Sequence, residues 1–209
     1  MPADSTVVID KILWGFIWFS VAALVLTIGV MIYFLIRYHH KRNPTPTEIP
    51  GNRWLEASWI VIPSILGVIM FWFGWTGFSF VTSAGGDDAI TVEVEAFQYG
   101  WEYAYENGAT SNALRVPVDT QIQLNVRSRD VIHNFYAPAF RIKMDAVPGM
   151  TNRLTFTPSE VGSYDVLCAE YCGLGHSSML SEVIVMPDSE FSTWYEEAGQ
   201  EAAETAQAE

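Results

Sequence analysis

Cysteine and histidine are scarce in this chain: two cysteines and four histidines occur among 209 residues. Both cysteines, one histidine and a methionine nevertheless share one stretch of twelve residues, CAEYCGLGHSSM, from Cys168 to Met179. A disulfide between the two cysteines would close a very small ring and would leave His176 and Met179 unexplained. A catalytic thiol is also disfavoured, because the sequence supplies no partner base in a triad-like arrangement.

Charged residues are absent from two long stretches, residues 12–36 and 57–86. Each stretch exceeds the ~20 apolar residues that a helix needs to cross a bilayer, and this length disfavours helices buried in a soluble core. We therefore expect a transmembrane hairpin with spans at 12–36 and 57–81, inside an N-terminal segment of residues 1–86. Aromatic residues lie near the ends of both stretches, as in the belts found at lipid headgroups: Trp14, Trp18, Tyr33, Trp59, Trp72 and Trp75.

Positive charge is limited as well, with 11 Lys and Arg against 24 Asp and Glu. The connection between the spans holds a group of these basic residues: Arg37, Lys41, Arg42 and Arg53. The residues before Lys11 include two acids and no base. The positive-inside rule then predicts a cytoplasmic loop at 37–56 and both termini on the exported side of the plasma membrane. No basic segment with a cleavage site precedes the first span, so no signal peptide is indicated.

Acidic residues are concentrated behind the hairpin. From Thr82 onward, twenty Asp and Glu accompany six Lys and Arg. Such a domain repels nucleic acid and attracts a basic partner with a strength that depends on salt. Solubility in a saline habitat explains the same composition equally well, and both explanations remain open.

Beyond the hairpin, alternation with a period of two predicts short strands that each bury one face. It is clearest in two segments: Ile90-x-Val92-x-Val94 and Ile122-x-Leu124-x-Val126. With turn residues between such segments, we expect an exported domain at 87–198 that folds as an antiparallel β-sandwich or Greek-key barrel. The Ala-, Glu- and Gln-rich end at 199–209 lacks apolar anchors, and we expect it to be frayed or disordered.

The twelve-residue stretch offers the ligands that favour copper. Thiolate, imidazole and thioether are soft or borderline donors, and a His₂Cys set with a weak axial Met forms an electron-transfer centre. Cys172, His176 and Met179 would lie on one loop between two strands. His133 is the available second histidine, because it is the other histidine of the exported domain.

A mononuclear centre needs one cysteine, so Cys168 is the informative residue. Two thiolates that bridge two copper ions would give each metal two sulfurs and one imidazole, with Met179 and a backbone carbonyl as weak outer ligands. A rigid sandwich that keeps this geometry constant would make electron transfer fast. His39 and His40 follow the first span and are explained more simply as interfacial side chains.

With these residues in view, the chain resembles subunit II of cytochrome c oxidase over nearly its whole length. The resemblance implies a membrane α plus all-β fold, in which a two-helix hairpin precedes a cupredoxin-like domain with the dinuclear copper A centre. The family's Cys-x-Glu-x-Cys-x₃-His-x₂-Met loop is matched without gaps by Cys168, Glu170, Cys172, His176 and Met179. Two further segments are similar to the family's: Asp130-Val-Ile-His133 and Lys143-Met-Asp-Ala-Val-Pro-Gly149.

The resemblance also implies roles for two acids. The carbonyl of Glu170 would be the remaining copper ligand, and its carboxylate would bind a Mg²⁺ shared with the catalytic subunit; a solvated loop acid is the alternative. Glu56 matches the position at the entrance of a proton pathway, where a plain interfacial glutamate is the alternative.

Two departures from the family concern the electron donor. The family's Gln-Trp-x-Trp segment reads Gln98-Tyr-Gly-Trp101 here, so Tyr99 replaces the surface tryptophan, and we expect electrons to arrive through Tyr99 and Trp101. Arg129 stands beside Asp130, where the family commonly has an acid that helps to dock a basic cytochrome c. We assign donor docking to Asp130, and expect cytochrome c or a small blue-copper protein as the donor.

The implied function is electron acceptance for a proton-translocating oxidoreductase. The chain would pass electrons to haem in catalytic subunit I, with subunit III also expected, and O₂ would become water there. No histidine lies within the spans, so the oxygen chemistry resides in another subunit. A membrane-tethered module that stores or delivers copper would use the same ligands and is the alternative. Quinol oxidase relatives lack these ligands, and a nitrous oxide reductase would need a further propeller domain.

Overall fold

The computed structural model describes residues 4–45, 48, 50–82, 86 and 89–208. By their contacts the residues fall into two units, one of Asp10–Gly77 and one of Phe78–Glu209 with Met1–Ile9.

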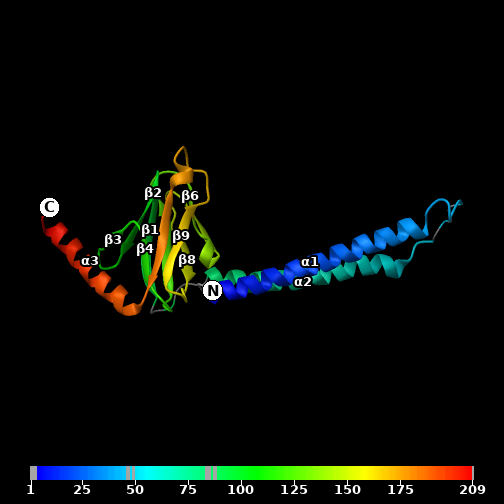
Figure 1. The fold of residues 1–209 in the computed structure, drawn as a ribbon, viewed down its shortest axis with the longest axis horizontal. Helices are drawn as coiled ribbons and strands as arrows, with labels where there is room; N and C mark the ends of the chain where they lie inside the picture. The colour runs from blue at the N-terminus through cyan, green and yellow to red at the C-terminus, as the bar shows by residue number, and fades with distance from the viewer. Residues whose placement is uncertain (1–3, 46–47, 49, 83–85, 87–88, 209) are drawn as a thin grey trace. The chain divides into compact units, whose positions relative to one another are not determined.

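Two long helices, α1 (Asp4–Arg37) and α2 (Arg53–Thr82), occupy the N-terminal part of the described chain (Figure 1). The segments Ile9–Arg37 and Arg53–Ser79 are long and apolar enough to cross a membrane. Their large apolar side chains lie open, with Trp18 67% and Phe71 68% exposed, as a lipid-facing surface requires. The predicted pair of apolar helices is confirmed, and the sidedness of the termini stays a prediction.

A side-chain cap sets the start of α2. The Asn52 Oδ1 atom accepts hydrogen bonds from the backbone N–H groups of Trp54 (3.0 Å) and Leu55 (3.3 Å). These bonds satisfy donors that have no partner inside the first helical turn. The helix therefore begins at Arg53, ahead of the span that the uncharged stretch predicts from residue 57.

Ten strands in the described residues form two five-stranded sheets (Figure 1). The first sheet has the order β3-β2-β1-β5-β8 and comprises β1 (Ile90–Phe97), β2 (Gly100–Tyr105), β3 (Thr110–Ser111), β5 (Ile122–Ser128) and β8 (Asn152–Phe156). The second has the order β4-β10-β9-β6-β7 and comprises β4 (Leu114–Pro117), β6 (His133–Ala137), β7 (Ile142–Ala146), β9 (Gly162–Cys168) and β10 (Leu180–Met186). The predicted two-sheet sandwich is confirmed.

The pairing of the strands is mixed. β1 runs parallel to β5, with Ile90 opposite Ile122, and β10 runs parallel to β4, with Val183 opposite Leu114. The other ladders among the described strands are antiparallel. The expectation of an antiparallel sandwich does not extend to these two pairs, because alternation defines the buried face of a strand and carries no information about its neighbour's direction.

The core lies between the inner faces of the two sheets. Trp101 of β2 packs edge-to-face on Phe135 of β6, with ring centroids 5.7 Å apart, which joins the sheets next to His133. Full burial of one large apolar side chain contributes roughly 1.5–3 kcal/mol. The alternation predicts the full burial of Val92, Val94, Ile122 and Leu124 in the first sheet. Phe135 and Val183 of the second sheet are fully buried as well.

The C-terminal helix α3 (Asp188–Ala208) packs against the β2–β3 turn. Trp194 lies edge-to-face on Tyr105 at 5.0 Å, and the Asn107 side-chain amide donates to the carbonyl of Tyr195 at 2.5 Å. The helix continues to Ala208, which differs from the disorder expected for 199–209; Glu209 lies outside the described residues. Ala, Glu and Gln are strong helix formers. They continue the helix whose first half is anchored by Trp194 and Tyr195.

Candidate metal centre

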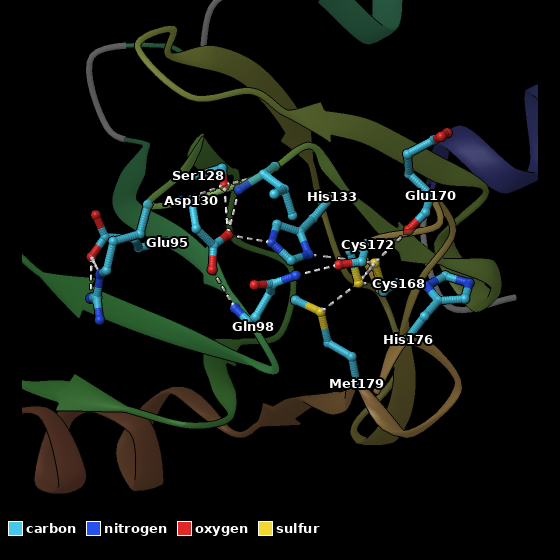
Figure 2. A network of polar contacts seen from close by, with 12 residues as sticks. Glu95, Gln98, Ser128, Asp130, His133, Cys168, Glu170, Cys172, His176 and Met179 are labelled. Carbon is cyan, nitrogen blue, oxygen red and sulfur yellow. Dashed lines mark hydrogen bonds and ion pairs between the residues drawn. The ribbon is translucent and has the colours of Figure 1, made fainter. Parts of the chain in front are cut away.

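Strand register brings the predicted ligands to one end of the sandwich (Figure 2). Cys168 ends β9 and pairs with Phe135 of β6, so His133 at the start of β6 lies close to it. The β9–β10 connection then carries Cys172 and His176 and returns at Met179, directly before β10. One loop and one neighbouring strand therefore supply the whole set.

The two sulfur atoms lie at the middle of the set. The Sγ atoms of Cys168 and Cys172 are 3.8 Å apart, which is far longer than the ~2.05 Å bond of a disulfide. Both thiols are free and buried. Every other predicted donor lies within 3.9 Å of one of these sulfurs. The contacts are His133 Nδ1 at 3.9 Å and the Glu170 carbonyl at 3.2 Å from Cys168, and His176 Nδ1 at 3.7 Å and Met179 Sδ at 3.8 Å from Cys172.

These separations suit ligands that share metal ions. Donor atoms about 2.0–2.3 Å from a common ion lie roughly 3–4 Å from one another. The ligand atoms of His133, Cys168 and Cys172 all lie within 4.8 Å of one another, and all three residues are buried. The structure thus brings together all six predicted donors, and their binding of copper stays a prediction.

Burial also affects the protonation of the Cys172 thiol. Desolvation, reinforced by the neighbouring Cys168 thiol, raises the pKa of Cys172 to about 11. The metal-free thiol is therefore protonated at neutral pH. A metal ion must displace this proton when it binds, because the thiolate is the ligand form.

Glu170 directs its two functional groups to opposite sides. Its carbonyl faces the Cys168 sulfur, whereas its carboxylate points away from the sulfurs (Figure 2), and the residue is exposed. This orientation fits the predicted carbonyl ligand and leaves the carboxylate free for another contact. The Mg²⁺ role stays a prediction.

Asp130 holds the ring of His133. Its Oδ1 atom lies 2.8 Å from His133 Nε2, while Oδ2 accepts the backbone N–H of Gln98 at 2.7 Å. Burial acts to raise the pKa of Asp130, but the hydrogen bonds from His133 and from the backbone N–H groups of Gln98 and Val131 lower it below its ordinary value. A carboxylate on Nε2 keeps the proton there, so the Nδ1 lone pair faces the sulfurs. Asp130, to which donor docking was assigned, therefore also orients the ring of His133.

The two predicted electron-path residues differ in exposure and in what they contact. Trp101 is 3% exposed and its ring lies edge-on to His133 at 6.4 Å. Tyr99 is 42% exposed and covers the ligand loop, because Cβ atoms added to Gly173 and Gly175 would lie 2.5 Å from Tyr99 atoms. Tyr99 is therefore open to solvent, whereas Trp101 is buried beside the predicted ligand His133.

Arg129 is paired with acids of the same sheet. It forms ion pairs with Glu95 and, at 3.3 Å, with Glu102, and its guanidinium lies 4.9 Å from the Phe97 ring centroid. Its charge is therefore largely compensated within the domain.

Glu56 and the adjacent histidines belong to the helical unit. Glu56 lies exposed in the first turn of α2, and its proton-pathway role stays a prediction. The rings of His39 and His40 follow α1 and are 4.4 Å apart; neither is among the residues gathered at the sulfurs.

Sequence reasoning missed Gln98 and the glycines of the loop. Gln98 Nε2 donates to the Cys172 carbonyl at 2.6 Å, and Gly173 and Gly175 make room for Tyr99. The Gly-x-Gly pattern between two ligands was the available signal, since glycine permits close backbone approach. Gln98 had no such signal, because its partner is a backbone atom distant in sequence.

The two-sheet sandwich, with sulfur and nitrogen donors gathered at one end, defines a cupredoxin-like domain that follows two apolar helices in the sequence. The family model described as cytochrome c oxidase subunit II, periplasmic domain, matches residues 88–186. The cytochrome c oxidase subunit 2 of Alkalihalophilus pseudofirmus is 35% identical over 195 residues, and that of Thermostichus vulcanus is 30% identical over 222 residues. The matches cover 88% and 79% of this chain, and 57% and 67% of the respective relatives.

Structural similarity agrees with these matches. The crystal structure of the periplasmic domain of subunit II of cytochrome oxidase from Bradyrhizobium japonicum has a TM-score of 0.53 and 31% identity, covering 56% of this chain and 97% of that domain. The chain belongs to the cytochrome c oxidase subunit II family. It spans little more than half the length of the Alkalihalophilus relative.

Replacing Gly175 with alanine should destabilise the sandwich. The added methyl would lie 2.5 Å from Tyr99 Cδ2 and 2.6 Å from Cγ, at the root of the ring, where a small rotation does not relieve the overlap. We expect the free energy of unfolding to fall by about 1–3 kcal/mol, measured by urea unfolding of the full chain in detergent with near-UV circular dichroism. Gly86→Ala, whose methyl meets Gln121 at an ordinary 3.5 Å, is the control; equal unfolding of both variants would contradict the packing of Tyr99.

Replacing Asp130 with asparagine should weaken metal binding. Both carboxylate oxygens accept N–H groups, whereas an asparagine has one acceptor oxygen, so one of the two bonds must be lost. We expect the affinity of the full chain for copper to fall about 10-fold in chelator competition, with Asp165→Asn on the exposed side of β9 as the control. Unchanged affinity together with a slower reaction with a basic cytochrome would instead assign Asp130 to docking alone.

Proposed function

We propose that this chain is the electron-accepting subunit of a membrane-bound haem-copper oxidase. Family membership supports the class of complex. One observation carries the rest: two free, buried sulfurs lie 3.8 Å apart, and four further donors of the expected types surround them. A mononuclear electron-transfer centre does not require the second thiol.

The donor set fits a dinuclear copper A centre. Cys168 and Cys172 would supply the thiolates, His133 and His176 the imidazoles, and Met179 with the Glu170 carbonyl the weak outer ligands. When bound, such a copper pair supplies one-electron transfer with little change of geometry. The chain contributes rigidity, because the ligands sit between strands whose core residues are fully buried.

The electron path is proposed to begin at Tyr99. This side chain is exposed on one side and rests on the ligand loop on the other, so a docked cytochrome c or small blue-copper protein would be one side chain away from the loop. Trp101 is buried and lies edge-on to His133. We propose that these two side chains carry the electron from a docked donor to the ligands.

The remaining partners are proposed from family membership. Catalytic subunit I would receive the electrons at its haem and reduce O₂ to water with proton translocation, with subunit III beside it. The outward Glu170 carboxylate would contribute to a Mg²⁺ site with subunit I, and Glu56 would lie at the entrance of a proton pathway. The sandwich would face the periplasm or cell exterior, and both spans would lie in the respiratory membrane.

A copper storage or delivery module is the competing function. Rapid metal exchange needs ligands open to solvent, yet His133 and Met179 are fully buried and Cys172 is 5% exposed. This burial favours a retained redox centre over a carrier that releases its metal.

Replacing Cys168 with serine should abolish the dinuclear centre. The variant loses one bridging thiolate, so the near-infrared absorption and the multi-line EPR signal of a mixed-valence pair should disappear from the copper-loaded full chain. Met179→Leu is the comparison, because it removes a weak outer donor and keeps both thiolates; it should retain a dinuclear signal with a shifted band. An unchanged spectrum for Cys168→Ser would refute the bridging assignment.

A further inference from the structure

We propose that Gln98 is a positioning residue that ties the two ligand-bearing segments of the centre to each other and to the opposite sheet. The inference rests on the proposed function, because it concerns how the chain holds the centre assigned above. It adds a role for a residue that touches no predicted metal-ligating side-chain atom.

Gln98 makes one bond to each ligand segment. Its backbone N–H donates to Asp130 Oδ2 at 2.7 Å, and Asp130 Oδ1 lies 2.8 Å from His133 Nε2. Its side-chain Nε2 donates to the carbonyl of Cys172 at 2.6 Å. Figure 2 shows Gln98 between Asp130 and the Cys172 carbonyl. A single residue therefore connects a histidine ligand, through a carboxylate, to the backbone of a cysteine ligand.

The connection crosses between the two sheets. His133 begins β6 and the cysteine loop joins β9 to β10, and all three strands belong to the second sheet. Gln98 lies between β1 and β2 of the first sheet. The Gln98 hydrogen bond, together with the packing of Tyr99, therefore links the ligand loop to the first sheet.

The loop backbone is built to accept this approach. Gly173 directly follows the bonded carbonyl and has φ of +132°, and a Cβ there would lie 3.0 Å from Gln98 Nε2 and 2.5 Å from Tyr99 Oη. Glycine is the residue that permits both the positive φ and the close contact. Tyr99, next to Gln98, covers the same loop, so adjacent residues hold it by a hydrogen bond and by packing.

The side-chain bond can be removed by itself. Gln98→Leu keeps a similar volume and leaves the backbone N–H available to Asp130, so the His133 orientation is preserved while Cys172 loses its donor. Gln98→Glu keeps the shape more closely but replaces the donor with an acceptor at neutral pH. Gln200→Leu, the same change at an exposed position of α3, is the matched control.

The experiment uses the full chain in detergent, loaded with copper. We expect both Gln98 variants to bind two copper ions, because every ligand remains. Copper loss to a strong chelator should be about 10-fold faster than in the unmodified chain. The EPR hyperfine splitting, the near-infrared band position and the midpoint potential should all shift, whereas Gln200→Leu should match the unmodified chain. Loss of overall stability alone would not move the spectrum of the intact folded fraction.

Two other results would separate the possible failures. Copper loss and spectra identical to the unmodified chain in both Gln98 variants would overturn the role of Gln98 and leave the copper centre standing. Failure of the unmodified chain itself to bind two copper ions would overturn the proposed function, and the inference with it.

Discussion

Strand register is the constraint that holds the two buried cysteine sulfurs side by side. Backbone hydrogen bonds close the neck of the ligand loop: the Cys168 N–H donates to the Met179 carbonyl at 3.3 Å, and the Ala169 N–H donates to the Asn134 carbonyl at 3.1 Å. These bonds continue the β9–β10 and β6–β9 ladders. Ligand geometry is thus a consequence of strand register, which the buried core stabilises.

The charges of the domain fall into two groups: paired charges on the first sheet and near its ends, and exposed acids on α3. Arg127 and Arg129 pair with Glu95, and both carboxylate oxygens of Asp130 take part in hydrogen bonds. Exposed ion pairs of this kind contribute at most about 1 kcal/mol each, so their main effect is to balance charge locally. Unpaired acidity is more evident on α3, where exposed acids recur: Glu190, Glu196, Glu197, Glu201 and Glu204. The overall negative charge therefore does not by itself describe the surface around Tyr99.

Much of this architecture was predictable because it rests on local patterns. Uncharged stretches define apolar helices by length, alternation defines the buried faces of β1 and β5, and ligand type with spacing defines the metal loop. The parallel pairing of β1 with β5 was not predictable, because direction depends on the path of the chain between them. The continuation of α3 past Gly199 depends on anchors distant in sequence. The bonds of Asp130 and Gln98 were missed for the same reason, since their partners meet only after the sheets pack.

In the proposed centre, the two thiolates hold a pair of copper ions as one electronic unit. Metal analysis combined with EPR of the copper-loaded full chain tests it most directly. Two copper atoms per chain and a seven-line hyperfine pattern, as expected when one unpaired electron is shared by two equivalent copper nuclei, are the predicted result. One copper atom per chain with a four-line pattern would contradict it.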